Sequence, residues 1–165
     1  MDEFDAPQDR FVQTATVLII ITFVALFLIF AAVDNTAGLI SVVVVGLPLL
    51  GLCYLFAPHG YGIDESGIHI RRKVGSVRIP VSQIQSVRYD PSACSLWGGR
   101  TFGVSGLFGY FGRFYTGHLG HHIRYATDRR RAVVIEADET YVISPDDPEL
   151  FVRLAQARLG ANRGT

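Results

Sequence analysis

The sequence predicts a mostly β protein of the α+β class: a transmembrane helical hairpin, then a seven-stranded antiparallel barrel capped by a C-terminal helix. Three observations predict it. Residues 14–57 are almost entirely apolar, residues 61–143 repeatedly alternate apolar with polar side chains, and an amphipathic stretch follows residue 147. A chain of 165 residues has room for the hairpin and one small domain.

These patterns divide the chain into five parts. Residues 1–13 are acidic and contain Pro7, which predicts a disordered cytoplasmic tail. Residues 14–57 form the hairpin, residues 58–60 form a linker, and residues 61–159 form the folded domain. Residues 160–165 are expected to be a disordered tail. The short linker implies that the domain sits directly at the membrane.

Both arms of the hairpin are long enough to cross a bilayer. Residues 15–33 are uncharged, and at about 1.5 Å per residue they span roughly 29 Å, close to the hydrocarbon thickness of a membrane. Residues 39–56 are also uncharged, and Pro48 predicts a kink there. Two buried core helices would need more surrounding chain than is present, and a cleaved signal peptide would need a basic segment where this chain is acidic.

The charge distribution predicts the topology. Residues 59–165 hold 14 of the 15 basic and 10 of the 15 acidic side chains, whereas the turn between the arms has only Asp34. Because Lys and Arg near membrane ends stay in the cytoplasm, we expect an inner-membrane protein with both termini cytoplasmic. Cys53 lies in the second arm and Cys94 is alone in the domain, so no disulfide within the domain is expected.

The folded domain shows a period of two. Seven short strands are predicted, separated by turns such as residues 64–67, 74–75, 128–130 and 138–139; the strands fall around residues 61, 68–71, 76–79, 86–89, 123–125, 133–135 and 141–143. A helix follows, with either Ser144 or Asp147 as its N-cap. Its apolar stripe, Leu150, Phe151, Leu154 and Ala157, is expected to close the open end of the barrel.

The order of seven strands and one helix resembles the pleckstrin-homology (PH) architecture. The bacterial PH-like domain family is the version it resembles most, through the run Tyr61 to Arg72, the pair Ile79 and Pro80, Ile84, the Gly-rich run 98–120, and the segments 125–128 and 144–149. Members of that family often follow membrane helices. The resemblance implies the fold from Tyr61 to about Leu159, but it carries over no catalytic residues.

Residues 98–120 are rich in glycine and aromatic side chains. Gly103, Gly106, Gly109 and Gly112 recur at every third position, without the lysine and spacing of a phosphate-binding P-loop. Two interpretations stay open: an ordered structural loop folded over the barrel, or an interaction surface covered by a partner or lipid. The residues of that interaction loop are Phe102, Phe108, Tyr110, Phe111, Phe114 and Tyr115.

A cationic set predicts contact with anionic lipid headgroups. If odd strands lead away from the bilayer and even strands return, the turn near Lys73 and the connection 91–121 face the membrane. The set comprises Arg71, Arg72, Lys73, Arg78, Arg100 and Arg113. The same hairpin resembles the place where eukaryotic PH domains hold phosphoinositides. The alternative is a solvated strand face, and the acidic turn 138–139 counts against the lipid interpretation.

Residues 129–131 form a second basic cluster, which the strand count places at the end of the domain remote from the membrane. Such a cluster is usually a solvated hairpin tip, so no nucleic acid is expected. His118, His121 and His122 lack the spacing of a metal site. No catalytic residues, cofactor or metal are therefore predicted.

The hypothesis for function is a non-catalytic, membrane-anchored binding or scaffolding module. Its expected partners are other membrane or cytoplasmic proteins, copies of itself, and anionic lipid. The alternative is a subunit of a homo-oligomeric pore or transporter, although neither arm holds the ionisable residues that transport paths usually show.

Overall fold

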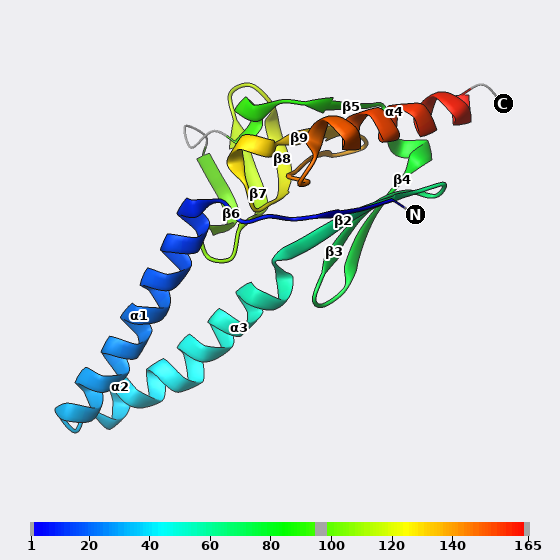
Figure 1. The fold of residues 1–165 in the computed structure, drawn as a ribbon. Coiled ribbons are helices and arrows are strands. Elements are labelled where there is room, and N and C mark those ends of the chain that lie inside the picture. Colours follow the sequence, from blue (N-terminus) through cyan, green and yellow to red (C-terminus); the bar gives the residue numbers. More distant parts are fainter. Residues whose placement is uncertain (1, 95–98, 164–165) are drawn as a thin grey trace.

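A computed structural model describes residues 2–94 and 99–163, with the side chains of residues 99–101 and 161–163 outside its description (Figure 1). The helices are α1 (Arg10–Ala32), α2 (Thr36–Ser41), the π-helical turn η1 (Val42–Gly46), α3 (Leu47–Phe56) and α4 (Pro148–Arg163). The 3₁₀ turns are η2 (Val81–Gln83), η3 (Pro91–Cys94) and η4 (Arg129–Arg131). The strands are β1 (Asp2–Asp5), β2 (Pro58–Asp64), β3 (Gly67–Arg72), β4 (Ser76–Pro80), β5 (Ser86–Tyr89), β6 (Gly99–Ser105), β7 (Tyr110–Thr116), β8 (Gly120–Ala126), β9 (Val133–Glu136) and β10 (Thr140–Ile143).

The apolar segment forms two long helices, as the sequence predicts. The first is α1, with 23 residues, and the second runs through α2, η1 and α3 for 21 residues; both are long and apolar enough to span a membrane. The π-helical turn lies directly before Pro48, whose missing N–H and bulky ring disturb the preceding turn. Near α2 the helices pack closely, since a Cβ on Gly38 or Gly46 would collide with a Phe ring of α1.

The two helices separate as they approach the domain. Figure 1 shows α1 and α3 diverging from α2, with the turn between β6 and β7 in the space between them. Asp9 is the N-cap of α1 through a 2.7 Å bond from the Val12 amide to its carboxylate. At the other end of the chain, the Leu150 amide donates to Asp147, so Asp147, and not Ser144, caps α4.

The domain consists of two open sheets, and the prediction of a closed seven-stranded barrel is wrong. One sheet has the order β1-β2-β3-β4 and the other β5-β9-β10-β8-β7-β6. All seven predicted strands exist, as β2 to β5 and β8 to β10, and residues 2–94 and 99–163 hold three more, β1, β6 and β7. The predicted antiparallel pairing also fails once: β10 returns from β9 into the position beside β8 and therefore runs parallel to β8.

Two segments expected to lack regular structure are strands. Residues 2–5 of the predicted disordered tail pair with β2, and Phe4 enters the core, where its ring meets Phe151 edge-on at 5.0 Å. The predicted linker 58–60 is the first part of β2. The predicted tail after residue 159 begins as helix, because α4 continues to Arg163.

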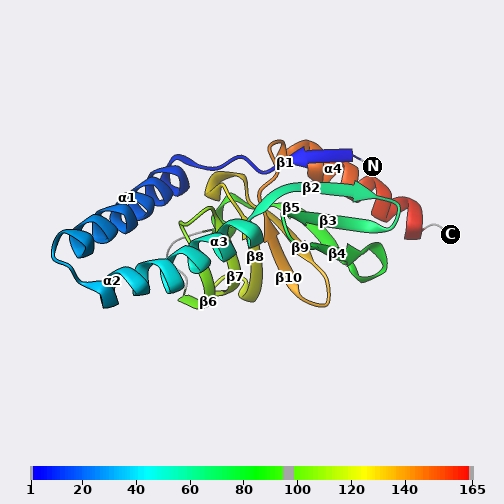
Figure 2. The same cartoon turned by 90° about the horizontal axis from the view of Figure 1, so that it is seen from below.

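The core lies between the two sheets and is covered by α4. It combines Ile63, Ile70 and Ile79 from the first sheet with Val133, Ile135 and Ile143 from the second, and with Phe151 and Ala155 from α4. Tyr61 joins the sheets because its hydroxyl donates to the Tyr125 carbonyl at 2.6 Å and accepts from the Ser144 amide. Figure 2 shows β1 beside β2 at the edge that α4 also approaches.

The glycine- and aromatic-rich segment is a β-hairpin and not the expected loop. Gly103 of β6 lies opposite Gly112 of β7, with φ of 150° and 125°, where the two backbones approach each other closely. A Cβ on either residue would strike the opposite main chain, so glycine is required at both. The short glycine spacing that suggested a loop therefore reflects close backbone contact within a strand pair.

Candidate functional site

The domain is attached to both helices of the hairpin. Four residues separate β1 from α1, and one residue separates α3 from β2. These strands pair with each other, Asp2 opposite Ile63 and Asp5 opposite Gly60. Because backbone hydrogen bonds link the segments outside the two helix ends, the hairpin and the domain form one connected structure.

The β6–β7 turn, residues 106–109, provides a second attachment. The hydroxyl of Thr16 in α1 donates to the Gly106 carbonyl at 3.3 Å and accepts from the Phe108 amide at 3.0 Å. On the other side, the Phe108 ring meets Tyr54 of α3 edge-on, with ring centroids 5.4 Å apart. The turn therefore contacts both helices and separates them where they meet the domain.

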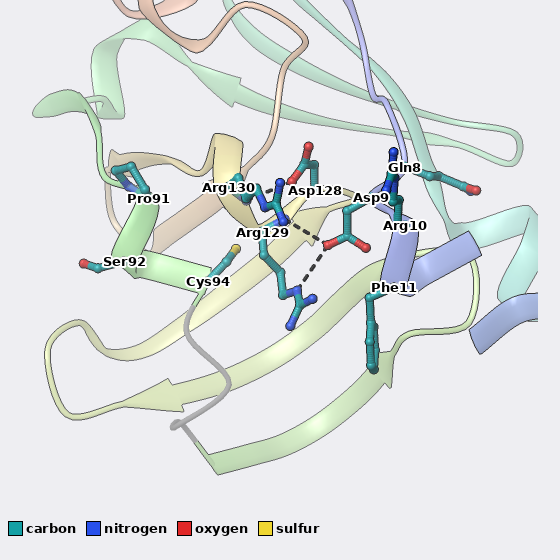
Figure 3. Close-up of a pocket in the computed structure, with 10 residues that line it drawn as sticks. All are labelled: Gln8, Asp9, Arg10, Phe11, Pro91, Ser92, Cys94, Asp128, Arg129 and Arg130. Atoms are coloured by element: carbon teal, nitrogen blue, oxygen red, sulfur yellow. Dashed lines mark hydrogen bonds and ion pairs between the residues drawn. The ribbon is translucent and has the colours of Figure 1, made fainter. Parts of the chain in front are cut away.

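A group of basic side chains surrounds the start of α1, lining a cavity of about 910 Å³ (Figure 3). Asp9 lies at its centre: Arg129 reaches this carboxylate through its Nε at 3.1 Å and through its main-chain amide at 3.4 Å. The Arg129 guanidinium also lies 4.7 Å from the centroid of the Phe11 ring. Arg10 and Arg130 are exposed on the same cavity. We call Arg10, Arg129 and Arg130 the α1-end cluster.

This position corrects the prediction for residues 129–131, which placed them remote from the hairpin. The β8–β9 connection lies against the segment before α1, because the Asp9 amide donates to the Thr127 carbonyl at 3.0 Å and the Thr127 hydroxyl donates to the Pro7 carbonyl at 2.8 Å. Counting strands as a simple meander fails here, because it makes β8 run opposite to β5. In the structure β8 is parallel to β10, while β10 and β5 are both antiparallel to β9, so β8 runs in the same direction as β5.

A second basic group lies at the end of α3. The Arg72 guanidinium lies 5.4 Å from the Phe56 ring centroid and 5.7 Å from that of Tyr125, and the Lys73 ammonium lies 4.7 Å from the Tyr54 ring. The Val74 amide donates to the Leu55 carbonyl at 3.2 Å, which fixes the β3–β4 turn to the helix end. We call Arg72 and Lys73 the α3-end pair.

Of the other predicted cations, the three whose side chains the structure describes do not join either group. Arg71 forms an ion pair with Glu3 of β1 at 2.8 Å, and Arg113 forms one with Glu139 at 3.2 Å. Arg78 is exposed on β4, opposite His69 of β3. The side chain of Arg100 lies outside the described part of the chain. The structure thus brings together two of the six predicted cations at a helix end.

The predicted interaction residues divide between packing and exposure. Tyr110, Phe111 and Phe114 are buried, which fits the structural interpretation. Phe102 and Tyr115 are 81% and 47% exposed, which fits the surface interpretation, and Phe108 is half-buried against Tyr54. One hairpin therefore supplies both the packed wall and the exposed aromatic side chains.

Two groups of Asp, Ser and His resemble catalytic triads in composition, but their geometry does not. The Ser66 and Ser92 hydroxyls donate to Asp64 and Asp90, within turns that also bind main-chain amides. His69 Nε2 lies 2.9 Å from Asp64 and 3.3 Å from the Ser66 hydroxyl, so one ring nitrogen faces both groups. A triad needs the serine and the carboxylate on opposite ring nitrogens, and neither serine has that arrangement.

A buried arginine in β8 is a feature that the sequence reasoning missed. Arg124 is 4% exposed and donates to His122 Nε2 and the Ala93 carbonyl, each at 3.0 Å, while its guanidinium lies over the Phe114 ring. Burial lowers the pKa of His122, so that its ring stays neutral and accepts from Arg124. The two residues are two positions apart in one strand and therefore lie on the same face, which is the sequence signal that could have linked them.

Thr16 and Asp9 were also missed as site residues. Threonine within an otherwise apolar arm, and aspartate three residues before an apolar helical run, are the signals that point to them. Both form hydrogen bonds with residues about a hundred positions away in the chain, and no local pattern shows such contacts.

The comparisons agree with this architecture. The family model of the bacterial PH domain matches residues 59–159, from the first residues of β2 into α4. No curated protein and no solved structure matches the chain. With most of its length covered by that match, the chain belongs to the bacterial PH domain family.

Proposed function

We propose that this protein is a membrane-anchored binding or scaffolding module without catalytic activity, held at the cytoplasmic face of the inner membrane. The hairpin crosses the membrane twice, and both termini lie in the cytoplasm. The observation that carries the proposal is the attachment of the domain to both helices, by the β1–β2 pairing and by the Thr16 bridge to the β6–β7 turn. A domain fixed in this way presents one defined orientation to its partners.

The surface of the hairpin supports membrane insertion. Val12 and Thr16 are the buried side chains of α1, and large apolar residues along both helices are exposed. So much apolar surface requires a covering of lipid or protein. The domain lies at the end of the hairpin opposite the turn between α1 and α2 (Figure 1). That turn contains Asp34 and no Lys or Arg, whereas the domain sequence is rich in Arg, which favours a cytoplasmic domain.

The two basic groups support contact with anionic lipid. The α1-end cluster and the α3-end pair flank the two points where the helices would leave the bilayer. Each basic residue near an anionic leaflet contributes about 1 kcal/mol. Since the domain is already attached, this energy would orient it and would not be needed to recruit it. Protein partners, including further copies of the chain, would bind the surface that faces the cytoplasm.

Cysteine labelling tests the topology. In a background without Cys53 and Cys94, single cysteines replace Asn35, next to the hairpin turn, and Arg153, exposed on α4. We expect an impermeant maleimide to label Asn35→Cys on intact cells and Arg153→Cys only after permeabilisation. Labelling of Arg153→Cys from outside would refute the cytoplasmic assignment.

A further inference from the structure

A groove of about 740 Å³ lies between the end of α3 and the second sheet. Its size is typical of small-molecule sites, which occupy about 300–1,000 Å³. Helix α3 contributes one wall, and strands β3, β6, β7 and β8 contribute the others; its residues include Leu52, Phe56, Arg72, Val104, Phe111 and Tyr125. The groove is therefore apolar and runs beside a helix whose outer side chains are exposed.

Arg72 is the charged residue of this groove. Its guanidinium lies 5.4 Å and 5.7 Å from the centroids of the Phe56 and Tyr125 rings, and its Nε is buried without a hydrogen-bond partner. Within residues 2–94 and 99–163, no carboxylate is paired with it. A buried N–H on a cation that lacks a partner is costly, so Arg72 is matched to an anionic acceptor from outside the chain.

The opposite wall is shaped for a flexible apolar chain. Gly103 and Gly112 leave a stretch of bare main chain between β6 and β7, so no side chain fills the groove there. Phe102, at 81% exposure, also lines the groove, and nothing in the described protein covers it. A ligand with both an apolar chain and an anionic group satisfies all of these features.

We infer that the groove holds one anionic glycerophospholipid drawn from the surrounding bilayer. An acyl chain lies along Leu52 and Phe56, and the phosphate accepts a hydrogen bond from Arg72. This inference rests on the proposed membrane insertion, because α3 then delivers the groove to headgroup depth. Lipid is favoured over a protein segment because Leu52 and Phe56 of the apolar helix α3 line the groove and are exposed, and because the uncompensated charge of the groove is positive.

The cavity at the start of α1 lacks this combination. There Arg129 is already paired with Asp9, and Asp128 adds a second carboxylate to the lining. The positive charge of Arg129 is thus largely compensated by these carboxylates, and it attracts an external anion less strongly than an unpaired arginine would. The α3 groove is therefore the place where a single lipid is retained, while the α1-end cluster contacts headgroups only at the surface.

Native mass spectrometry of the full-length protein tests the inference. The protein is purified in detergent micelles supplied with phosphatidylglycerol or phosphatidylcholine at equal concentration. We expect one bound phosphatidylglycerol per chain, retained at least tenfold better than phosphatidylcholine. Arg72→Gln removes the cation and Val104→Phe fills the groove while leaving Arg72 in place, so each should reduce retention at least tenfold.

Arg153→Gln is the matched control, because Arg153 is exposed on α4 and does not line the groove. It should retain lipid as the native protein does. Equal retention by Val104→Phe or by phosphatidylcholine would overturn the inference, as would a native protein free of lipid. Should Arg72→Gln not fold, Val104→Phe decides. Correct maleimide labelling with no retained lipid would refute the groove alone, whereas reversed labelling would refute the proposed function.

Discussion

Replacing Thr16 with valine should release the β6–β7 turn from α1. The side chains have nearly the same volume, so packing is preserved, but the hydroxyl that binds Gly106 and Phe108 is lost. Thr16 is 8% exposed, and leaving the Phe108 amide without an acceptor there costs about 1–3 kcal/mol. At about 2 kcal/mol, the equilibrium for local opening of the turn should rise roughly 30-fold.

Hydrogen exchange of the full-length protein measures this opening directly. The Phe108 amide should exchange about 30-fold faster in Thr16→Val than in the native protein, because exchange follows the free energy of local opening. Thr22→Val is the control, since the Thr22 hydroxyl donates to the Leu18 carbonyl within the same helix. Unchanged exchange at Phe108 in Thr16→Val would show that the turn is not held by α1.

Three further changes test the attachment and the electrostatics through thermal unfolding of the full-length protein. Asp9→Ala should destabilise it about 1 kcal/mol more than Asp9→Asn does. Both variants lose the ion pair with Arg129, but Asn keeps a side-chain oxygen that caps the helix. Equal losses of stability in the two variants would argue against the cap. Burial lowers the pKa of His122, so the unfolded chain binds more protons than the folded chain below about pH 6.5, and stability falls as the pH drops. His122→Gln should weaken this acid sensitivity. An unchanged slope of stability against pH would contradict the reasoning. Hydrogen bonds from the Ser66 hydroxyl, and then from His69, lower the pKa of Asp64. Its carboxylate therefore stabilises the fold above about pH 4, and this contribution is lost as the pH falls towards the pKa of the folded state. Asp64→Asn should be less stable than the native protein at pH 7, and a difference in stability that persists in acid would refute this reasoning.

Local patterns in the sequence predicted the two long apolar helices, the strands β2 to β5 and β8 to β10, and the C-terminal helix. The two apolar arms became α1 and the continuous helix 36–56, and the irregularity lies directly before Pro48. All seven predicted strands formed where side chains alternate, because a half-buried strand requires that alternation in its own residues. The resemblance to the bacterial PH domain family was confirmed over residues 59–159.

Pairing between distant segments could not be predicted in the same way. Strand β1 is a four-residue polar edge strand in which Phe4 is the buried side chain, so it carries almost no pattern of its own. The β6–β7 hairpin was hidden because Gly103 and Gly112 serve a backbone approach that only their pairing explains. The direction of β8, which is the same as that of β5 and brings Arg129 to the start of α1, depends on the pairing of distant strands, and no single strand encodes it.

The same division holds for the candidate site. The sequence by itself determined which side chains are cationic or aromatic and that two apolar helices precede the domain, because these properties belong to individual residues and their neighbours. Only the tertiary structure decided that Arg71 and Arg113 are paired with carboxylates while Arg72 faces a groove without one. Compensation of charge depends on distances of a few ångströms between residues far apart in the chain, and folding alone sets those distances.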